Sequence, residues 1–161
     1  MSVSIRRAGE SEATSLAPLL TALCRRSKAS WGYPPELMAR WADDLRIEPD
    51  DIARDIVLVA ETQPGAIEGF ARVSVRADHS QLKDLWVDPP AMGQGIGRAL
   101  WDAAVVAARA LPFDELRLAA DPNAEAFYER MGARRIGEVE SEVVNGRRLP
   151  LMGFDLRATS G

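Results

Sequence analysis

The 161-residue sequence contains only one cysteine, Cys24, and only one histidine, His79. A single cysteine cannot form a disulfide within the chain, and these two residues cannot supply the ligands of an ordinary structural zinc site. Leucines precede Cys24 at helical spacing and no histidine lies near it in sequence, which favours a buried thiol over a nucleophile. The sequence therefore predicts neither a metal site nor cysteine chemistry.

Long basic runs and long apolar runs are also missing. The net charge is −4 and the isoelectric point is near 5.1, whereas sequence-independent binding to nucleic acid requires clustered lysine and arginine. No apolar stretch approaches the roughly 18 residues of a membrane-spanning helix, and residues 1–7 show no hydrophobic signal core. We therefore expect a cytoplasmic protein that binds neither nucleic acid nor membranes.

Apolar periodicity and turn residues predict an α/β domain, and residues 1–161 fit one domain rather than two. Strands are expected at residues 3–6, 56–60, 67–76, 82–87, 116–120, 136–144 and 149–156. Helices are expected at residues 11–28, 35–45, 97–110 and 122–131. Asp121 and Pro122 are typical of a helix N-cap and a first helical position, and Asn145-Gly146 predicts a tight hairpin between the last two strands.

A glycine-rich segment, Gly-Gln-Gly-Ile-Gly at residues 93–97, lies between a predicted strand and a long predicted helix. The first N–H groups of a helix are unpaired and carry about half a positive charge, and glycine lets a backbone approach an anion closely. The segment therefore predicts a phosphate-binding loop. The alternative is a tight strand-to-helix connection in which glycine serves only the turn.

A dinucleotide-binding domain also uses such a loop, and Asp121 follows the next strand about where a ribose-binding acid would lie. That fingerprint, however, reads G-x-G-x-x-G and begins almost at the strand end, whereas residues 88–92 intervene here and the glycines read G-x-G-x-G. Helices and antiparallel strands also precede the loop. Both differences disfavour a dinucleotide-binding domain.

Two longer motifs resemble those of a known family. Residues 85–89, Leu-Trp-Val-Asp-Pro, and residues 92–100, Met-Gly-Gln-Gly-Ile-Gly-Arg-Ala-Leu, resemble the acetyl-CoA motif of the GNAT superfamily of N-acetyltransferases. Residues 123–133 are similar to its second signature, at the usual separation. The resemblance implies a single-domain α/β fold with a mixed, mostly antiparallel sheet of six to seven strands and about four flanking helices, splayed near residues 85–87.

The resemblance further implies acetyl-CoA as the co-substrate, with no metal. The residues that it assigns to acetyl-CoA are Leu85, Trp86, Val87, Gly93, Gln94, Gly95, Ile96, Gly97, Arg98, Asn123 and Tyr128. Two positions depart from the family pattern, since Met92 stands where Arg or Gln is usual and Asp121 stands where Asn is frequent. Whether Asn123 or Asp121 contacts coenzyme A stays open.

The reaction implied by the resemblance is direct attack of an amine on the thioester of acetyl-CoA. Tyr128 matches the family's usual proton donor to the sulfur, and its alternative role is that of a core aromatic. Asp84 is the candidate base, because it interrupts an apolar strand; alternation would place it on one face with Leu82 and Trp86. An ion pair with a nearby arginine is the alternative for Asp84.

Acceptor binding in this family usually involves the first two helices and the final hairpin. Trp31 and Tyr33 flank a glycine there and predict either the wall of a pocket for an apolar or cationic amine or a support for the turn. His79 is a third candidate, since its ordinary pKa suits proton transfer, although exposure alone would explain it. A small-molecule amine is the expected acceptor, with a protein amine as the alternative, and the resemblance allows a homodimer. The non-enzymatic alternative is a coenzyme A sensor or structural protein without a base.

Overall fold

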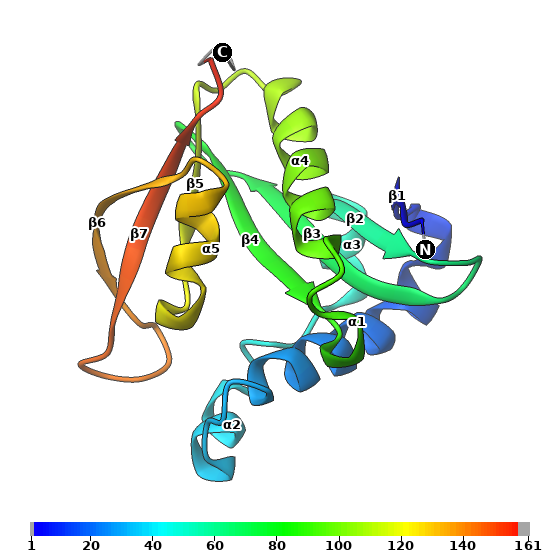
Figure 1. Ribbon diagram of the computed structural model, residues 1–161, viewed down its shortest axis with the longest axis horizontal. Coiled ribbons are helices and arrows are strands. Elements are labelled where there is room, and N and C mark those ends of the chain that lie inside the picture. Colours follow the sequence, from blue (N-terminus) through cyan, green and yellow to red (C-terminus); the bar gives the residue numbers. More distant parts are fainter. Residues whose placement is uncertain (1, 158–161) are drawn as a thin grey trace.

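A seven-stranded sheet in the order β1-β2-β3-β4-β5-β7-β6 organises the computed structural model, which describes residues 2–157 (Figure 1). The strands are β1 (Ser4–Arg7), β2 (Ile56–Glu61), β3 (Ile67–Val75), β4 (Ser80–Val87), β5 (Glu115–Ala119), β6 (Arg134–Glu140) and β7 (Arg148–Asp155). Only β4 and β5 pair in parallel among these neighbours. The predicted mixed, mostly antiparallel sheet is therefore confirmed.

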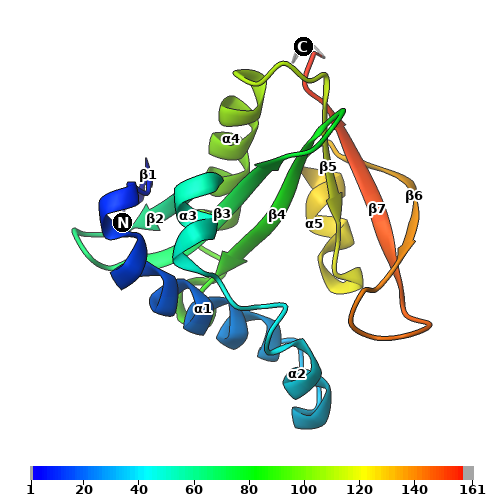
Figure 2. The ribbon, with the colours of Figure 1, turned by 180° about the vertical axis from the view of Figure 1, so that it is seen from behind.

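Helices cover both faces of the sheet. They are α1 (Ala13–Ala29), α2 (Pro35–Trp41), α3 (Pro49–Arg54), α4 (Ile96–Arg109) and α5 (Glu125–Arg130). Helices α4 and α5 lie on the face seen in Figure 1, whereas α1 and α3 lie on the face seen in Figure 2. Each face has its own apolar core, one around Leu100 and Trp101 of α4 and the other around Leu20 and Leu23 of α1.

Helix α3 was not predicted. It begins at Pro49, and the Asp51 carboxylate accepts a hydrogen bond of 2.9 Å from the Glu48 backbone N–H, which caps the first turn. Periodicity could not reveal a helix of 6 residues, because a reliable helical pattern needs about 10 or more.

A β-bulge changes which side chains share a face of β4. Arg72 of β3 stands opposite Asp84, but the next residue, Val73, stands opposite Leu82, so Lys83 is the extra residue. Leu82 therefore packs into the α4 core, while Trp86 packs into the α1 core. The predicted alternation, which placed Leu82 with Asp84 and Trp86, holds for Asp84 and Trp86 but is wrong for Leu82, because a bulge interrupts the two-residue period.

Strands β4 and β5 separate after a short stretch of pairing. They pair only at Ser80 with Leu116 and at Gln81 with Arg117, and then diverge, as Figure 1 shows. The Asp88 N–H donates to the Glu68 carbonyl of the neighbouring chain segment at 2.8 Å. Because donors alternate along a strand, the N–H groups of Leu85 and Val87 face the widening gap. This is the splay that the resemblance implied near residues 85–87.

The final hairpin has a longer loop than the sequence predicted. Strand β6 ends at Glu140, and the Ser141 hydroxyl accepts the N–H groups of Val143 and Val144 at 3.2 and 3.0 Å. These bonds turn the chain out of the sheet, so both valines pack against the α1 core instead of extending β6. Gly146 keeps the expected turn conformation, with φ 81°.

The ends of two predicted helices also differ. Residues Glu10–Glu12 form a 3-10 turn, so α1 begins at Ala13 rather than near Ser11. Residues Pro122–Ala124 form a second 3-10 turn before α5, although Asp121 caps it by accepting the Asn123 N–H at 2.9 Å, as predicted.

Cys24 is fully buried in α1, and its sulfur lies 3.0 Å from the Leu45 carbonyl oxygen. Burial raises the pKa of the thiol to about 12, so the nucleophilic thiolate is scarce near neutral pH. The predicted buried thiol is confirmed. Between residues 2 and 157, the helices all fall short of the length and apolar character that crossing a bilayer requires.

Candidate functional site

The glycine loop adopts a backbone conformation that favours glycine. Gly93 and Gly95 have φ values of 80° and 84°, and Gly95 is the N-cap of α4. A Cβ atom built on either glycine meets no heavy atom within 4 Å. The two glycines are therefore required by the turn, and the space beside them is open to a ligand.

The loop also presents a row of unused hydrogen-bond donors. Within residues 2–157, no backbone N–H from Gly93 to Arg98 donates a hydrogen bond, and the first to do so is Ala99, which bonds the Gly95 carbonyl at 3.1 Å. These donors lie at the positive end of the α4 dipole. Such an array fits a diphosphate, which supplies several anionic acceptors.

Side chains around the loop divide into buried and exposed groups. Ile96 is buried in the α4 core, whereas Gln94 and Arg98 are exposed. Gly97 has a different role from the other two glycines, because a Cβ there would lie 3.3 Å from the Phe127 ring. The third glycine therefore permits close packing of α4 on α5.

The strand before the loop is anchored to α1. The Arg26 guanidinium donates two hydrogen bonds, of 3.0 and 2.9 Å, to the carboxylate of Asp88. Leu85, Trp86 and Val87 are half-buried along the diverging edge of β4. The free edge of β4 thus leads directly to the row of donors in the loop.

Tyr128 projects from α5 into the packed region between α4 and the sheet. Its side chain is 7% exposed, and its ring lies 5.1 Å from Phe127 and 5.8 Å from Trp101. Burial raises the pKa of the phenol well above its usual value, and the negative charges of Asp84 and Asp121 add to the increase. The hydroxyl therefore stays protonated and can act as a hydrogen-bond donor.

Asp84 has one engaged oxygen and one without a donor. Its Oδ1 accepts the Trp86 indole N–H at 3.0 Å, and its Oδ2 lies 3.0 Å from Nε of Arg72. The Arg72 N–H does not point at that oxygen, so the contact is an ion pair without a hydrogen bond, and Oδ2 has no donor among residues 2–157. Arg72 is also 3.1 Å from Asp51 and 3.8 Å from Asp55.

A polar cluster joins α1 to the loops after β5 and β6. The Asp121 carboxylate lies 3.1 Å from the Lys28 ammonium and accepts the Tyr33 hydroxyl at 2.9 Å. That hydroxyl accepts 2.9 Å hydrogen bonds from Asn123 Nδ2 and from Arg147 Nη2. Tyr33, Asn123 and Asp121 are thus brought together, with the Asn123 amide and the Asp121 carboxylate both bonded inside the cluster.

Opposing effects set the charge states in this polar cluster. Burial alone would raise the pKa of Asp121, but the Asn123 N–H and the Lys28 charge outweigh it and hold the pKa below its usual value. Burial lowers the pKa of Lys28, and the Arg147 charge lowers it further, while Asp121 opposes both. Lys28 and Arg147 were missed as site residues, since Lys28 resembles any solvated helix residue and Arg147 belongs to no motif.

Two predicted acceptor residues are not part of this polar cluster. Trp31 is 45% exposed in the turn after α1. His79 lies in the β3–β4 turn, where its Nδ1 is 2.7 Å from Asp78. Strands rise about 3.3 Å per residue, so β4 separates His79 from the glycine loop by more than about 20 Å. The structure therefore does not bring His79 together with the other candidates.

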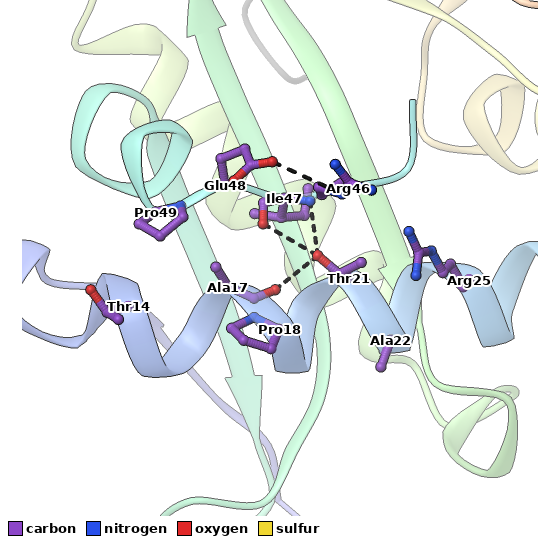
Figure 3. Close-up of a pocket in the computed structure, with 10 residues that line it drawn as sticks. All are labelled: Thr14, Ala17, Pro18, Thr21, Ala22, Arg25, Arg46, Ile47, Glu48 and Pro49. Carbon is purple, nitrogen blue, oxygen red and sulfur yellow. Dashed lines mark hydrogen bonds and ion pairs between the residues drawn. The ribbon is translucent and has the colours of Figure 1, made fainter. Parts of the chain in front are cut away.

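Two cavities are separate from the candidate site. One of about 390 Å³ lies between α1 and the segment before α3, where the Thr21 hydroxyl accepts the Ile47 N–H at 2.9 Å and donates to the Ala17 carbonyl at 2.9 Å (Figure 3). The other, of about 580 Å³, lies beside Arg72 and α3. Neither is lined by the glycine loop, by Tyr128 or by the polar cluster.

Comparisons with known proteins agree with this geometry. The family model described as an acetyltransferase (GNAT) domain matches residues 53–132. A GCN5-related N-acetyltransferase from Rhodopseudomonas palustris is 24% identical over 96% of both chains, with a TM-score of 0.71. PaiA N-acetyltransferase from Thermoplasma acidophilum, solved with coenzyme A, is 18% identical over 96% of this chain and 99% of that one, with a TM-score of 0.69.

A third similar structure is yncA from Salmonella typhimurium, solved with acetyl-CoA. It is 17% identical over 100% of this chain and 98% of its own, with a TM-score of 0.67. No curated protein sequence matches the chain significantly. Residues 53–132 thus match the GNAT acetyltransferase domain, and the whole chain shares the fold of these N-acetyltransferase structures, including the glycine loop and the splayed sheet that the resemblance to the GNAT superfamily implied.

Proposed function

We propose that the protein transfers an acetyl group from acetyl-CoA to a primary amine by direct attack of the amine on the thioester. The observation that carries the proposal is the row of unpaired N–H groups from Gly93 to Arg98, beside the free edge of β4. The match of residues 53–132 to the GNAT acetyltransferase domain supports acetyl-CoA as the co-substrate. An acceptor of small size is favoured because Val143 and Val144 pack against the α1 core and occupy space on that side of the sheet.

The protein would hold acetyl-CoA through its backbone. The donors from Gly93 to Arg98 suit the pyrophosphate, and the exposed Arg98 adds a positive charge at the same end of α4. The N–H groups of Leu85 and Val87 suit the amide carbonyls of pantetheine, which would pair with β4 as an added strand. Acetyl-CoA supplies the activated thioester.

Acetyl transfer then requires two groups of the chain, a base that accepts a proton from the amine and a donor to the departing sulfur. A lysine-like amine with a pKa of about 10.4 requires about 4.6 kcal/mol to be neutral at pH 7, so a base near the amine increases the reactive fraction. We assign this role to Asp84, whose Oδ2 has no hydrogen-bond donor within residues 2–157. The amine nitrogen forms the new bond to carbon as the carbon–sulfur bond breaks, and the Tyr128 hydroxyl donates a hydrogen bond to the departing thiolate. The proton that the nitrogen loses on becoming an amide goes to the thiolate, which leaves as the thiol.

A second candidate function is a coenzyme A sensor or structural protein without catalysis. The observation that favours it is the Arg72–Asp84 ion pair, because the pair gives Asp84 a structural role that requires no catalysis. Robust thiol release in the presence of any amine would exclude this candidate.

Replacing Gly95 with valine should weaken acetyl-CoA binding at least tenfold, or about 1.4 kcal/mol. The reason is that a β-branched residue cannot easily adopt φ 84° and would occupy the open space beside the loop. Gly65→Val is the matched control, since Gly65 has φ 82° and open space but lies in the β2–β3 turn. Calorimetry should show weakened binding only for Gly95→Val, and equal affinities in both variants would refute the assignment.

Replacing Tyr128 with phenylalanine should lower kcat by on the order of a hundredfold and leave acetyl-CoA affinity nearly unchanged. The ring packing against Phe127 and Trp101 is retained, so only the hydroxyl is removed. Steady-state kinetics across the pH range would measure the effect. A rate within about twofold of wild type at every pH would reduce Tyr128 to a packing residue.

Replacing Asp84 with asparagine should flatten the acidic limb of the pH–rate profile, because the variant no longer has a carboxylate that must be ionised to act. Asp55→Asn is the control, since it removes another buried carboxylate near Arg72 without changing β4. Both variants should lose stability, but only Asp84→Asn should change the profile. An intact acidic limb in Asp84→Asn would assign Asp84 to the ion pair alone.

A further inference from the structure

The acceptor side of the splayed strands carries two cations around one carboxylate. Lys28 Nζ lies 3.1 Å and Arg147 Nη2 lies 3.6 Å from the same oxygen, Asp121 Oδ2. The side chains are largely removed from water, with 11% of Lys28, 19% of Arg147 and 9% of Asp121 exposed. Asp44 is the other acid that acts on Lys28, and it is exposed to solvent. The buried part of the cluster therefore has an excess positive charge.

Arg147 also has hydrogen-bond donors that have no acceptor among residues 2–157. Its Nη2 donates to the Tyr33 hydroxyl at 2.9 Å, whereas its Nε and Nη1 have no hydrogen-bond partner among residues 2–157. Its guanidinium lies over Trp41, with Cζ 4.7 Å from the ring centroid, and this cation–π contact helps to hold the group in place. Nη2 carries two hydrogens and Tyr33 accepts one of them, so the other Nη2 hydrogen and a neighbouring hydrogen on Nε or Nη1 can bind a carboxylate through two parallel hydrogen bonds.

Lys28 fills the place that a cationic acceptor would need. Its ammonium lies 4.0 Å from the centroid of the Trp41 ring, 5.3 Å from that of Tyr33 and 5.9 Å from that of Trp86. These aromatic rings already stabilise a cation of the protein itself. A second cation here would be repelled by both Lys28 and Arg147. Tyr33 therefore does not favour the cationic amine that the sequence allowed.

This cluster is close to the strands where acetyl transfer is proposed to occur. Asp121 lies two residues after the end of β5, and Trp86 belongs to the diverging half of β4. The charges of Asp121 and Asp84 both raise the pKa of Tyr128, which agrees with their lying on the same side of the diverging strands as its hydroxyl or close to it. An acceptor held at Lys28 and Arg147 by one end could present its other end to that region.

We propose that Lys28 and Arg147 bind a carboxylate of the acceptor, so that the substrate is an amine that also carries a carboxylate, as an α-amino acid does. The inference rests on the proposed acetyl transfer and adds the acceptor class to it. Asp121 and Tyr33 hold the two cations in place, and the carboxylate of the acceptor neutralises the excess charge.

Paired acceptors test this directly. The common L-amino acids and the corresponding carboxamides are assayed for thiol release from acetyl-CoA. For the best acceptor, wild type should favour the free carboxylate over the carboxamide at least about tenfold in kcat/KM, because hydrogen bonds to charged groups are the strong ones. Arg147→Gln should remove most of this preference by raising KM for the carboxylate far more than KM for the carboxamide.

Arg148→Gln is the matched control. Arg148 is the next residue, is 61% exposed and pairs with Glu138 at 2.7 Å, so this variant should keep the preference. Arg147→Lys should restore part of it, since charge is retained but the planar fork is lost. Equal or better activity with carboxamides in wild type would overturn the carboxylate site and leave acetyl transfer intact. Thiol release with no amine at all would overturn acetyl transfer, and the acceptor class with it.

Discussion

The divergence of β4 from β5 is the constraint on which the rest of the structure depends. Parallel neighbours in the middle of a sheet normally stay hydrogen-bonded along their length, yet these two pair at only two positions. A buried backbone group without a partner destabilises a fold by roughly 1–3 kcal/mol. The N–H groups facing the gap therefore require water or a ligand, and a pantetheine arm supplies carbonyl groups at strand-like spacing.

The divergence also separates two chemically different sides of the sheet. On the α4 side, the donors from Gly93 to Arg98 and the buried Tyr128 suit an anionic, thioester-bearing molecule. On the α1 side, Lys28 and Arg147 gather around Asp121, and Val143 and Val144 pack against that core. The two sides adjoin along the diverging halves of β4 and β5. Because each face of the sheet has its own apolar core, the residues on one face can differ without repacking the core of the other face.

Features set by local sequence were predictable, and those set by distant contacts were not. The glycine loop follows from residues 93–97, because turns and helix caps depend on nearby residues. The bulge at Lys83 and the Arg72–Asp84 ion pair depend on strand register, which no local pattern reveals. The contact between Tyr33 and Arg147 joins residues 114 positions apart. The acceptor side was therefore only approximately located from sequence, and its charge was not foreseen.

Hydrogen exchange with and without acetyl-CoA measures the central claim, that backbone donors of this chain hold the co-substrate. The account predicts slower exchange at the N–H groups of Leu85 and Val87 and in the segment from Gly93 to Arg98, because these groups have no partner in the described part of the chain. Exchange at the backbone N–H groups of the residues that line the cavity beside Arg72 should stay unchanged. Unaltered exchange in β4 and the glycine loop at saturating acetyl-CoA, or protection confined to that cavity, would contradict the account.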